Sequence, residues 1–584
     1  MIDSDHTVYY ACKYTPLELL AGFGANARLA ETDAAGFDEA DRLAHPNLCG
    51  YGKGLIQRLL ADDVHEAVLV TCCDVIKRAY DVLLERGQMD FLYLLDLPHG
   101  RGPAERRIFR ARLADLAKKY AAYSGRTFDP GRALAAFVPP VPRTDDRVTL
   151  LGAHATGALL DAVGKGVGYP VQNRTCSERH VLASPPANLA RMAPSGDCEA
   201  CDVAQAGAGT DPATASLDAF LDWYADALLD QTPCMRMDDV AARQDLFGAQ
   251  GQRGVIYHTM KFCDYYGFEY AVANEEKGTP MVKIETDGTS QSAGQLRTRL
   301  EAFGETLRGA EAAQDLATSR PASAKGTFVM GVDSGSTSTD AVIVNDKGEV
   351  ISSVIVPTGA KATQSAQRAK QEALQKAGLS EEDMALKVAT GYGRDNIPQM
   401  DTAITEITCH ARGAHHLAPQ ARTIIDIGGQ DSKVIHLDQD GGVTNFVMND
   451  KCAAGTGRFM EMMARTLEMP LDEFCETGLH WKKDVRISSM CTVFAESEVV
   501  SLVAEDTPTP DIIHGLCESV ARKTATLAKR VDGEAPYLMT GGVANNLGVV
   551  KALEDVLGAP VQTHEESQLC GAIGAALLGL ESLR

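Results

Sequence analysis

The sequence predicts an α/β protein built from several sheet-containing units, and three observations support this class. Short apolar runs typical of buried strands alternate with longer helical patterns through most of the chain. Glycine-rich turns follow several of these runs. The chain has 584 residues, of which 45% are hydrophobic. That is enough for three or four domain-sized units, each with its own core.

The charge balance and the cysteine count narrow the function classes. The 56 basic and 79 acidic residues give a formal net charge of −23, which argues against nucleic acid or an anionic membrane as the main partner. No apolar stretch is long enough to span a membrane, and no apolar segment with a basic flank marks a signal peptide, so we expect a cytoplasmic protein. Fifteen cysteines in a cytoplasmic chain favour metal or cluster binding over disulfides.

The region up to residue 306 is predicted to form two α/β halves, residues 1–145 and 146–306. In the first half, a strand at residues 67–71 leads through Cys72 and Cys73 into a helix. In the second half, a strand that starts at Val255 leads to Cys263. Parallel sheets bind ligands at the carboxyl ends of their strands. We therefore expect the halves to face each other across a cleft lined with cysteines.

Four more cysteines of this region lie in loops or just before helical starts: Cys12, Cys49, Cys176 and Cys234. Any one of them alone is better explained as a buried structural cysteine, but six in the loops of one region favour a shared ligand. Cys198 and Cys201 form a CxxC in a polar stretch rich in Gly and Ala, without a second pair to complete a zinc ribbon. We interpret that stretch as a surface insertion and leave the role of its cysteines open.

Residues 1–306 resemble the D-component, or cluster-binding subunits, of the 2-hydroxyacyl-CoA dehydratase family. The resemblance is carried by TCCDVIKRAYD, LYLLDLP, TPCMRM, GVIYHTMKFCDYYGFEY and IETDGTSQSAGQLRTRLEAF. It implies two Rossmann-like halves that hold a 4Fe-4S cluster at their interface, with Cys49, Cys73 and Cys263 as ligands by motif position. Cys73 matches, rather than Cys72, because the family's cysteine directly precedes an Asp.

Six candidate ligands exceed the three or four cysteines that one cubane needs. The additional ones resemble the branch called double-cubane cluster proteins, whose members reduce small molecules. We therefore favour a double cubane over the single cubane of an acyl-CoA dehydratase, which usually employs two different homologous subunits. The following residues, 307–326, are poor in large apolar side chains and contain Pro321, so they are predicted to be a linker.

Residues 327–584 contain three glycine-rich turns that follow apolar strands. FVMGVDSGSTSTDAVIV is strand, turn and strand, TIIDIGGQDSKVIHL repeats that pattern about 95 residues later, and YLMTGGVANN supplies the third turn. The first turn leads into a strand and lacks GK[ST], which argues against a Walker P-loop or a Rossmann fingerprint. The three turns resemble the phosphate and adenosine motifs of the actin, sugar kinase and Hsp70 superfamily. The resemblance implies a duplicated nucleotide-binding domain.

The superfamily resemblance also implies a role for individual residues of these turns. Asp333 and Asp426 would face the Mg²⁺–phosphate end of ATP, and Gln430 or Asp431 would orient the attacking water. Glycines let backbone amides approach phosphate oxygens without a Cβ in the way. The remaining nucleotide-binding candidates are Gly331, Ser334, Gly335, Ser336, Thr337, Ser338, Gly428, Gly429, Gly541, Gly542 and Asn545.

Two cysteine motifs lie between the second and third turns, and each precedes a predicted helix. NDKCAAGTGRF contains Cys452, and SSMCTVFAESE contains Cys491. Two cysteines are too few for a closed 4Fe-4S site, but a two-fold dimer would supply the missing pair. The motifs resemble those of the BadF/BcrA-type ATP-dependent activators of 2-hydroxyacyl-CoA dehydratases and benzoyl-CoA reductases, which implies a cluster shared across a homodimer. We interpret the other cysteines of this region as structural; these are Cys409, Cys475, Cys517 and Cys570.

We interpret the chain as an ATP-driven, low-potential electron-transfer enzyme. An electron from ferredoxin or flavodoxin would pass from the C-terminal cluster to the N-terminal cluster, which would reduce a small substrate. One alternative is a 2-hydroxyacyl-CoA dehydratase or its activator, acting on a CoA thioester. A second is a metabolite kinase, since the same turns serve phosphoryl transfer, and a third is a cluster carrier without turnover. The kinase alternative leaves Cys452, Cys491 and the whole N-terminal region without a role.

Overall fold

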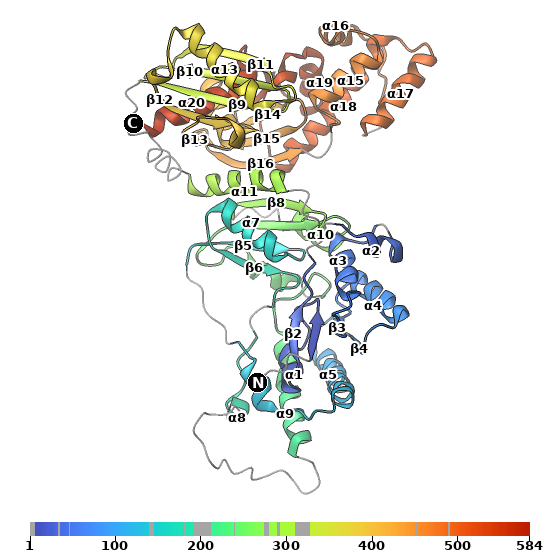
Figure 1. The fold of residues 1–584 in the computed structure, drawn as a ribbon. Helices are drawn as coiled ribbons and strands as arrows, with labels where there is room; N and C mark the ends of the chain where they lie inside the picture. The colour runs from blue at the N-terminus through green and yellow to red at the C-terminus, as the bar shows by residue number, and fades with distance from the viewer. Residues whose placement is uncertain are drawn as a thin grey trace. The chain divides into compact units, whose positions relative to one another are not determined.

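The computed structural model describes residues 6–32, 36–45, 47–138, 145–179, 182–190, 212–238, 240–273, 279–288, 293–309, 327–449, 453–488 and 491–584. The chain divides into two compact units, Met1–Arg297 and Thr298–Arg584, and the boundary falls inside helix α11 (Ala293–Arg308). Figure 1 shows the elements of each unit. Cys198, Cys201, Cys452 and most of the predicted linker lie outside the described residues.

The N-terminal unit contains two four-stranded sheets with the same topology, β2-β1-β3-β4 and β6-β5-β7-β8, and every strand pairing in them is parallel. The first sheet consists of β1 (Thr7–Tyr10), β2 (Asn26–Leu29), β3 (Glu66–Val70) and β4 (Phe91–Leu95). The second consists of β5 (Arg147–Gly152), β6 (Val171–Thr175), β7 (Gln252–Met260) and β8 (Met281–Thr286). The repeated order confirms the two Rossmann-like parallel-sheet halves.

Helices connect the parallel strands of both sheets, as parallel pairing requires. They are α1 (Leu17–Gly22), α2 (Asp38–Leu43), α3 (Gly50–Leu59), α4 (Asp74–Arg86), α5 (Pro103–Ser124), α6 (Pro130–Ala135), α7 (Gly157–Val167), α8 (Ala187–Ala190), α9 (Pro212–Leu229), the 3-10 helix η1 (Val240–Leu246) and α10 (Asp264–Ala273). Although α9 follows the fifth and sixth strands in sequence, it packs against α1 and α5 of the first half. Tyr224 of α9 donates a hydrogen bond to the Glu18 carboxylate of α1 at 2.5 Å.

The C-terminal unit contains two five-stranded sheets that repeat one topology, β11-β10-β9-β12-β13 and β16-β15-β14-β17-β18. In each sheet, the first three strands are antiparallel and the last two are parallel. This repetition confirms the duplicated fold of the actin, sugar kinase and Hsp70 type. The strands are β9 (Phe328–Ser334), β10 (Ser338–Val344), β11 (Val350–Pro357), β12 (Met384–Thr390), β13 (Thr402–Ala403), β14 (Thr423–Ile427), β15 (Ser432–Leu437), β16 (Val443–Asn449), β17 (Tyr537–Thr540) and β18 (Val561–Gln562).

The helices of this unit cover the two sheets. They are α13 (Ala362–Ala377), η3 (Glu381–Asp383), η4 (Arg394–Asn396), α14 (Glu406–Leu417), α15 (Gly457–Thr466), α16 (Leu471–Thr477), η5 (Gly478–His480), α17 (Thr492–Ala504), α18 (Thr509–Arg530), η6 (Gly542–Asn545), α19 (Leu547–Leu557), η7 (Ser567–Leu569) and α20 (Cys570–Ser582). Helices α14 and α20 pack so closely that a Cβ added to Gly574 would lie only 1.8 Å from the Cys409 carbonyl oxygen. Among the described residues, no helix has both the length and the apolar character needed to cross a bilayer.

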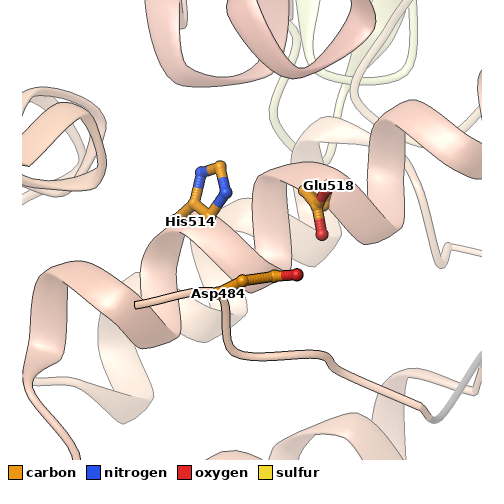
Figure 2. Close-up of side chains that lie close together, drawn as sticks. All are labelled: Asp484, His514 and Glu518. Atoms are coloured by element: carbon orange, nitrogen blue, oxygen red, sulfur yellow. The ribbon is translucent and has the colours of Figure 1, made fainter. Parts of the chain in front are cut away.

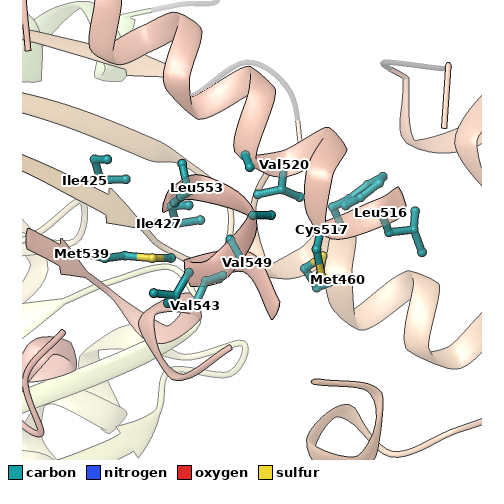
Figure 3. Packing of buried hydrophobic residues seen from close by; sticks show 14 of the residues in the cluster. Ile425, Ile427, Met460, Leu516, Cys517, Val520, Met539, Val543, Val549 and Leu553 are labelled. Carbon is teal, nitrogen blue, oxygen red and sulfur yellow. The ribbon is translucent and has the colours of Figure 1, made fainter. Parts of the chain in front are cut away.

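The core of the second half holds the strand ends in place (Figure 3). Ile425 and Ile427 of β14 are fully buried in one cluster with Met539 of β17. Leu516 of α18 and Leu553 of α19 belong to the same cluster. Burial of a side chain of this size contributes about 2 kcal/mol. The turn that follows Ile427 is therefore attached to a rigid layer, which positions it for binding.

Candidate functional site

Seven cysteines of the N-terminal unit lie at the ends of strands or helices, or at the starts of helices. They are Cys12 after β1, Cys49 before α3, Cys72 and Cys73 after β3, Cys176 after β6, Cys234 after α9, and Cys263 between β7 and α10. Cys49 and Cys73 are the N-cap residues of their helices. Free amide groups at a helix start favour a negatively charged partner, such as a thiolate or an iron–sulfur cluster. The structure thus places all six cysteines predicted from the sequence in one region, together with Cys72.

Cys72, which the sequence comparison set aside, lies between two of the predicted ligands. Its thiol is hydrogen-bonded to both Cys12 and Cys73. The hydrogen bond from Cys72 lowers the pKa of Cys73. Burial raises the pKa of Cys12, but the hydrogen bond from Cys72 acts against it and the net pKa is lowered. The Cys72–Cys73 dipeptide itself was the signal, because it places two adjacent thiols at the end of one strand.

The other thiols are connected to this group by electrostatic interactions. Burial raises the pKa of Cys49 to about 11 and that of Cys263 to about 12. The charge of Cys263 interacts with Cys49, Cys73 and Cys234, while Cys176 interacts with Cys234 and Cys263. Metal ligation requires thiolates, so a positively charged group must accompany ionisation of these buried thiols. Iron would supply that charge, and the donor set fits iron–sulfur ligation.

Buried polar atoms near the thiols also fit a cluster. Within the described part of the chain, Thr15 Oγ1 and His154 Nε2 are buried and have no hydrogen-bond partner. The His154 ring packs on Tyr51 with centroids 4.2 Å apart, and its Nδ1 hydrogen-bonds with Ser177 Oγ, directly after Cys176 in the chain. Cluster sulfurs accept hydrogen bonds, so these atoms are suitable donors at the periphery of such a group.

A buried lysine adds positive charge to the same place. Lys13 is 2% exposed, and its Nζ donates to the Thr232 carbonyl oxygen at 2.6 Å. Burial lowers the pKa of Lys13 to about 8, and the nearby thiols of Cys234 and Cys12 oppose that decrease. A fixed cation beside several thiolates lowers the cost of gathering their negative charges.

In the C-terminal unit, the two predicted phosphate turns lie against each other. The turn between β9 and β10 contains Thr337, and the turn between β14 and β15 contains Gly429. A Cβ on Gly429 would lie 1.8 Å from Thr337 Oγ1, so only glycine allows this approach. Gly393 also lies close to the first turn, since a Cβ added to it would lie 2.6 Å from Ser334 Oγ. The third turn joins them at Gly541, where φ is +80° and a Cβ would lie 2.5 Å from the Ile427 carbonyl oxygen.

Asp426 forms the centre of a buried charge cluster. Its carboxylate accepts hydrogen bonds from Lys433 Nζ at 3.2 Å and from Thr540 Oγ1 at 2.9 Å. His410 Nε2 lies 3.3 Å from the same carboxylate. Burial raises the pKa of Asp426, but His410 and Lys433 outweigh it, and the pKa falls well below the ordinary value. Asp426 is therefore ionised at neutral pH.

Two further acidic side chains surround Lys433. Asp431 lies 2.7 Å from its Nζ, and Glu406 of α14 lies 3.3 Å from it. The predicted water-orienting candidates thus differ in their surroundings, because Asp431 is held by Lys433 while Gln430 is exposed at the tip of the turn. Gly542 and Asn545 are exposed as well.

Asp333 lies on β9 at the position that Asp426 takes on β14, but its surroundings are different. Asp333 pairs with Asp340 of β10, whereas Asp426 pairs with Lys433 of β15. Burial raises the pKa of Asp333. Burial, followed by the charge of Asp333, raises the pKa of Asp340 to about 8.

The sequence interpretation missed Asp340 and Lys433, although a signal was present. Each lies seven residues after the aspartate of its turn, at the same place in the repeated strand–turn–strand pattern. Glu406 and His410 gave no such signal, because they reach the site from α14 across the sheet. Thr337 Oγ1 and Asp340 Oδ1 are buried without a hydrogen-bond partner among the described residues. Orphaned oxygens beside glycine-lined turns fit a magnesium nucleotide.

The second phosphate turn is bonded directly to the helix that follows the Cys452 segment. Gly457 N, the first residue of α15, donates to the Gly428 carbonyl oxygen at 2.9 Å, and Arg458 N donates to that of Gly429 at 2.8 Å. Cys491 is exposed and caps the start of α17. Four apolar side chains of α17 are also exposed: Val493, Phe494, Val500 and Val503. The second turn is therefore bonded directly to the start of α15, and α17 presents an apolar surface beside Cys491.

The C-terminal part of helix α11 contacts the start of α14, the helix that carries Glu406 and His410. Glu305 accepts hydrogen bonds from Thr405 N at 3.1 Å, from Thr405 Oγ1 at 2.5 Å and from Thr408 Oγ1 at 2.5 Å, at the start of α14. Glu301 forms an ion pair with Arg394, which is next to Gly393 in the chain. Arg299 donates to the Met448 carbonyl oxygen at the end of β16. Residues 298–308 thus hold the start of the helix that carries Glu406 and His410.

A separate group of possible metal ligands lies on α18 (Figure 2). His514 and Glu518 are one helical turn apart, and Asp484 faces them from the preceding loop. The His514 ring stacks on Trp481 with centroids 3.9 Å apart. Glu518 is already paired with Arg522, and Asp484 is exposed, so we assign no ion to this group.

Comparisons with known proteins find a matching protein family for each of the two units. The BadF/BadG/BcrA/BcrD ATPase family model matches residues 330–579. The model of the 2-hydroxyglutaryl-CoA dehydratase D-component matches residues 12–138 and 197–307.

This chain covers nearly the whole length of the relatives that match its C-terminal unit. The activator of lactoyl-CoA dehydratase from Anaerotignum propionicum is 48% identical over 255 residues, which are 44% of this chain and 98% of the relative. The activating ATPase of (R)-2-hydroxyglutaryl-CoA dehydratase from Acidaminococcus fermentans is 46% identical over 251 residues, or 43% of this chain and 96% of the relative. A solved structure of the 2-hydroxyisocaproyl-CoA dehydratase activator from Clostridium difficile, with bound ADPNP, is 42% identical and covers 44% of this chain and 95% of that one, with a TM-score of 0.42. The chain therefore belongs to the BadF/BadG/BcrA/BcrD ATPase family, and its ATPase unit follows a unit of the 2-hydroxyglutaryl-CoA dehydratase D-component type.

Proposed function

We propose that the chain combines a reductive ATPase activator with its own electron acceptor, and that the acceptor serves a 2-hydroxyacyl-CoA dehydratase reaction. The observation that carries this proposal is the pair of backbone hydrogen bonds from Gly457 and Arg458 to the second phosphate turn. Through them, the nucleotide turn is connected to the start of α15, the helix that follows Cys452 in the chain. The names of the relatives, which are activators of dehydratases, support the same reaction class.

The residues of the duplicated unit have distinct tasks in ATP hydrolysis. The two glycine turns hold the phosphates with backbone amides, and Asp426 stays ionised at their centre because Lys433 and His410 neutralise it. We assign the orientation of the attacking water to Gln430, which is exposed, rather than to Asp431, which is bound to Lys433. Loss of the terminal phosphate changes the contacts of the second turn, and the start of α15 moves with it.

The cysteines of this unit fit a shared site in a two-fold dimer. Cys452 and Cys491 of each protomer would together supply four thiolates. The exposed apolar side chains of α17 beside Cys491 are suited to pack against their symmetry mates. A 4Fe-4S cluster bound there would supply one-electron transfer, with ferredoxin or flavodoxin as the donor. Differential affinity for ATP and ADP then favours one arrangement of α15 and α17 over the other.

The seven thiols of the N-terminal unit constitute the acceptor site. Several of them follow strands of the two parallel sheets, and open α/β sheets bind their ligands at such strand ends. A single cubane needs at most four of them. The excess is the specific observation that favours a second candidate function, in which a double cubane reduces a small molecule instead of assisting dehydration of a CoA thioester.

Iron analysis of the full chain, reconstituted anaerobically, tests both parts of the proposal. About four irons in the N-terminal unit indicate the dehydratase-like single cubane, and about eight indicate the double cubane. The Cys491→Ala variant should lose about two irons per chain and all ATP-dependent reduction of the N-terminal site, while it still binds nucleotide. Cys475→Ala serves as the control, because Cys475 is half-buried and belongs to neither predicted set of cluster ligands. Unchanged iron and unchanged reduction in Cys491→Ala would disprove the shared cluster.

A further inference from the structure

The hydroxyl of Tyr266 lies beside one of the predicted cluster ligands of the N-terminal unit. Tyr266 belongs to the first turn of α10, which follows Cys263, and its side chain is 4% exposed. Its Oη lies 3.7 Å from the Sγ of Cys234, a contact of the length that the large sulfur atom allows for a hydrogen bond. A phenol is protonated at neutral pH, whereas a cysteine that ligates iron is a thiolate and can only accept. When Cys234 ligates iron, the hydrogen bond therefore runs from Tyr266 to Cys234.

A buried arginine holds Tyr266 and the segment of Cys234 in this arrangement. The Arg243 guanidinium lies 5.7 Å from the centroid of the Tyr266 ring. Its Nη1 donates to the carbonyl oxygen of Pro233, directly before Cys234, at 2.6 Å. Its Nη2 donates at 2.9 Å to the carboxylate of Glu269, one turn after Tyr266 on α10, and its Nε donates to the same carboxylate. Arg243 thus connects the peptide that precedes Cys234 with the helix that carries Tyr266.

Two further contacts fix the backbone around Cys234. Lys13 Nζ donates to the Thr232 carbonyl oxygen at 2.6 Å, and Cys234 N donates to Tyr14 Oη at 3.3 Å. Lys13 and Arg243 are 2% and 3% exposed, so both cations that hold this segment are shielded from water. A hydrogen bond in such surroundings is stronger than one in water, because the local dielectric constant is low. The distance between the Tyr266 hydroxyl and the Cys234 sulfur is consequently set by buried contacts on both sides.

We propose that the Tyr266 hydroxyl, positioned by the Arg243–Glu269 ion pair, donates a hydrogen bond to the Cys234 sulfur and raises the reduction potential of the N-terminal site. This inference rests on the proposed ligation by Cys234 and adds a positioning residue to it. Reduction places more negative charge on the ligand sulfurs, so a fixed donor stabilises the reduced state more than the oxidised state. An acceptor that is easier to reduce lowers the driving force that the ATPase unit has to supply.

A comparison of reduction potentials tests the role of Tyr266. Full chains with and without Tyr266→Phe are reconstituted anaerobically and titrated with low-potential reductants under electron paramagnetic resonance. All of them carry Cys491→Ala, which removes the proposed C-terminal cluster from the titration. Tyr266→Phe keeps the ring and loses only the hydroxyl, so the iron content should stay the same. The equilibrium constant for reduction should fall at least about tenfold, which corresponds to about 59 mV for one electron.

The matched control is Tyr270→Phe, which removes a hydroxyl from the same helix. The Tyr270 ring packs on Tyr257, with centroids 5.5 Å apart, and not on a thiol of the group. Tyr270→Phe should leave both the iron content and the potential unchanged. A shift in Tyr270→Phe equal to that in Tyr266→Phe would show that the helix as a whole, and not the Tyr266 hydroxyl, sets the potential.

A second variant changes the strength of the donor in the opposite direction. Incorporation of 3-fluorotyrosine at position 266 keeps the hydroxyl and makes it more acidic, so the hydrogen bond strengthens and the potential should rise. If Tyr266→Phe loses iron, the fluorinated chain decides alone, and a raised potential supports the inference. An unchanged potential in either variant, at full iron content, would overturn the inference while leaving the cluster assignment intact. Absence of iron from the parent chain would instead refute both.

Discussion

The two units use the same architectural device with different chemistry. Each is built from two sheets of one topology, and each gathers its candidate site where strands end. In the N-terminal unit, the site consists of side chains, namely seven thiols. In the C-terminal unit, it consists of backbone turns that approach one another closely at glycines and that lie beside buried charges such as Lys433 and His410. A side-chain site specifies its ligand by residue type, whereas a backbone site specifies it by shape and local charge.

The largest expected effect tests whether the N-terminal site depends on its thiols. Cys263→Ser should remove at least one cubane, about four irons, from the reconstituted full chain. The reason is that serine is a poor iron ligand and that Cys263 interacts with three other thiols of the group. Iron analysis and absorption spectroscopy measure the loss.

The control for this experiment is Cys475→Ser, the same substitution in the ATPase unit. Full iron content in Cys263→Ser, with an unchanged spectrum, would show that the thiols of the group are not equivalent members of one site. That result would contradict the interpretation of the N-terminal site as a site built from thiol side chains.

The second prediction concerns the buried charges of the ATPase unit. Burial lowers the pKa of His410, but the Asp426 carboxylate outweighs burial, and the pKa rises from 6.5 to about 9. A raised histidine pKa stabilises the folded state at pH values below about 6.5, and the contribution is lost as pH rises through about 9. The shift corresponds to about 3 kcal/mol as an upper value. Replacement by a neutral side chain should remove this pH dependence.

The pH-dependent contribution of His410 is measured by thermal unfolding of the wild-type full chain and of His410→Gln between pH 6 and pH 9.5. The unfolding transition of the ATPase unit is identified by its shift on addition of ADP and Mg²⁺. The difference in midpoint between the two proteins should be largest at pH 6 and should shrink towards pH 9.5. A difference that stays constant or grows with pH would show that His410 is not the charged partner of Asp426.

The sequence was sufficient to predict the fold, and it supplied candidate residues for both sites, for identifiable reasons. Alternating strands and helices predict parallel sheets, and Gly428 and Gly429 are recognisable because phosphate turns require them. Cys73 and Cys263 are recognisable because each lies between a strand and a helix. Among the partners of Asp426, His410 could not be predicted, since it comes from a helix and its contact depends on how that helix packs on the sheet. Charge compensation across elements is a tertiary property and has no local pattern.

The boundary between the two units raises the last and smallest prediction. Helix α11 lies inside the match to the dehydratase component, which ends at residue 307, yet its residues from Thr298 onward belong to the ATPase unit. Glu305 is the strongest contact, because one carboxylate accepts three hydrogen bonds at the start of α14. Burial raises the pKa of Glu305, while the donors on Thr405 and Thr408 and the charge of Arg394 act against this increase. The amide of Glu305→Gln is a weaker acceptor, and we expect a loss of about 1 kcal/mol, or roughly fivefold in kcat for ATP hydrolysis.

The distinction between a positioning role and mere stability lies in which constants change. Glu305→Gln should lower kcat with little change in nucleotide affinity, because α14 carries Glu406 and His410 to the site while the phosphates are held by the turns. Glu372→Gln, an exposed glutamate of α13 in the same unit, is the matched control and should leave both constants unchanged. If Glu305→Gln only lowers the unfolding midpoint, α11 is a structural attachment. If only kcat falls, residues that belong to the match with the dehydratase component influence the rate of ATP hydrolysis. Helix α11 then has a functional role in the ATPase unit in addition to connecting the two units.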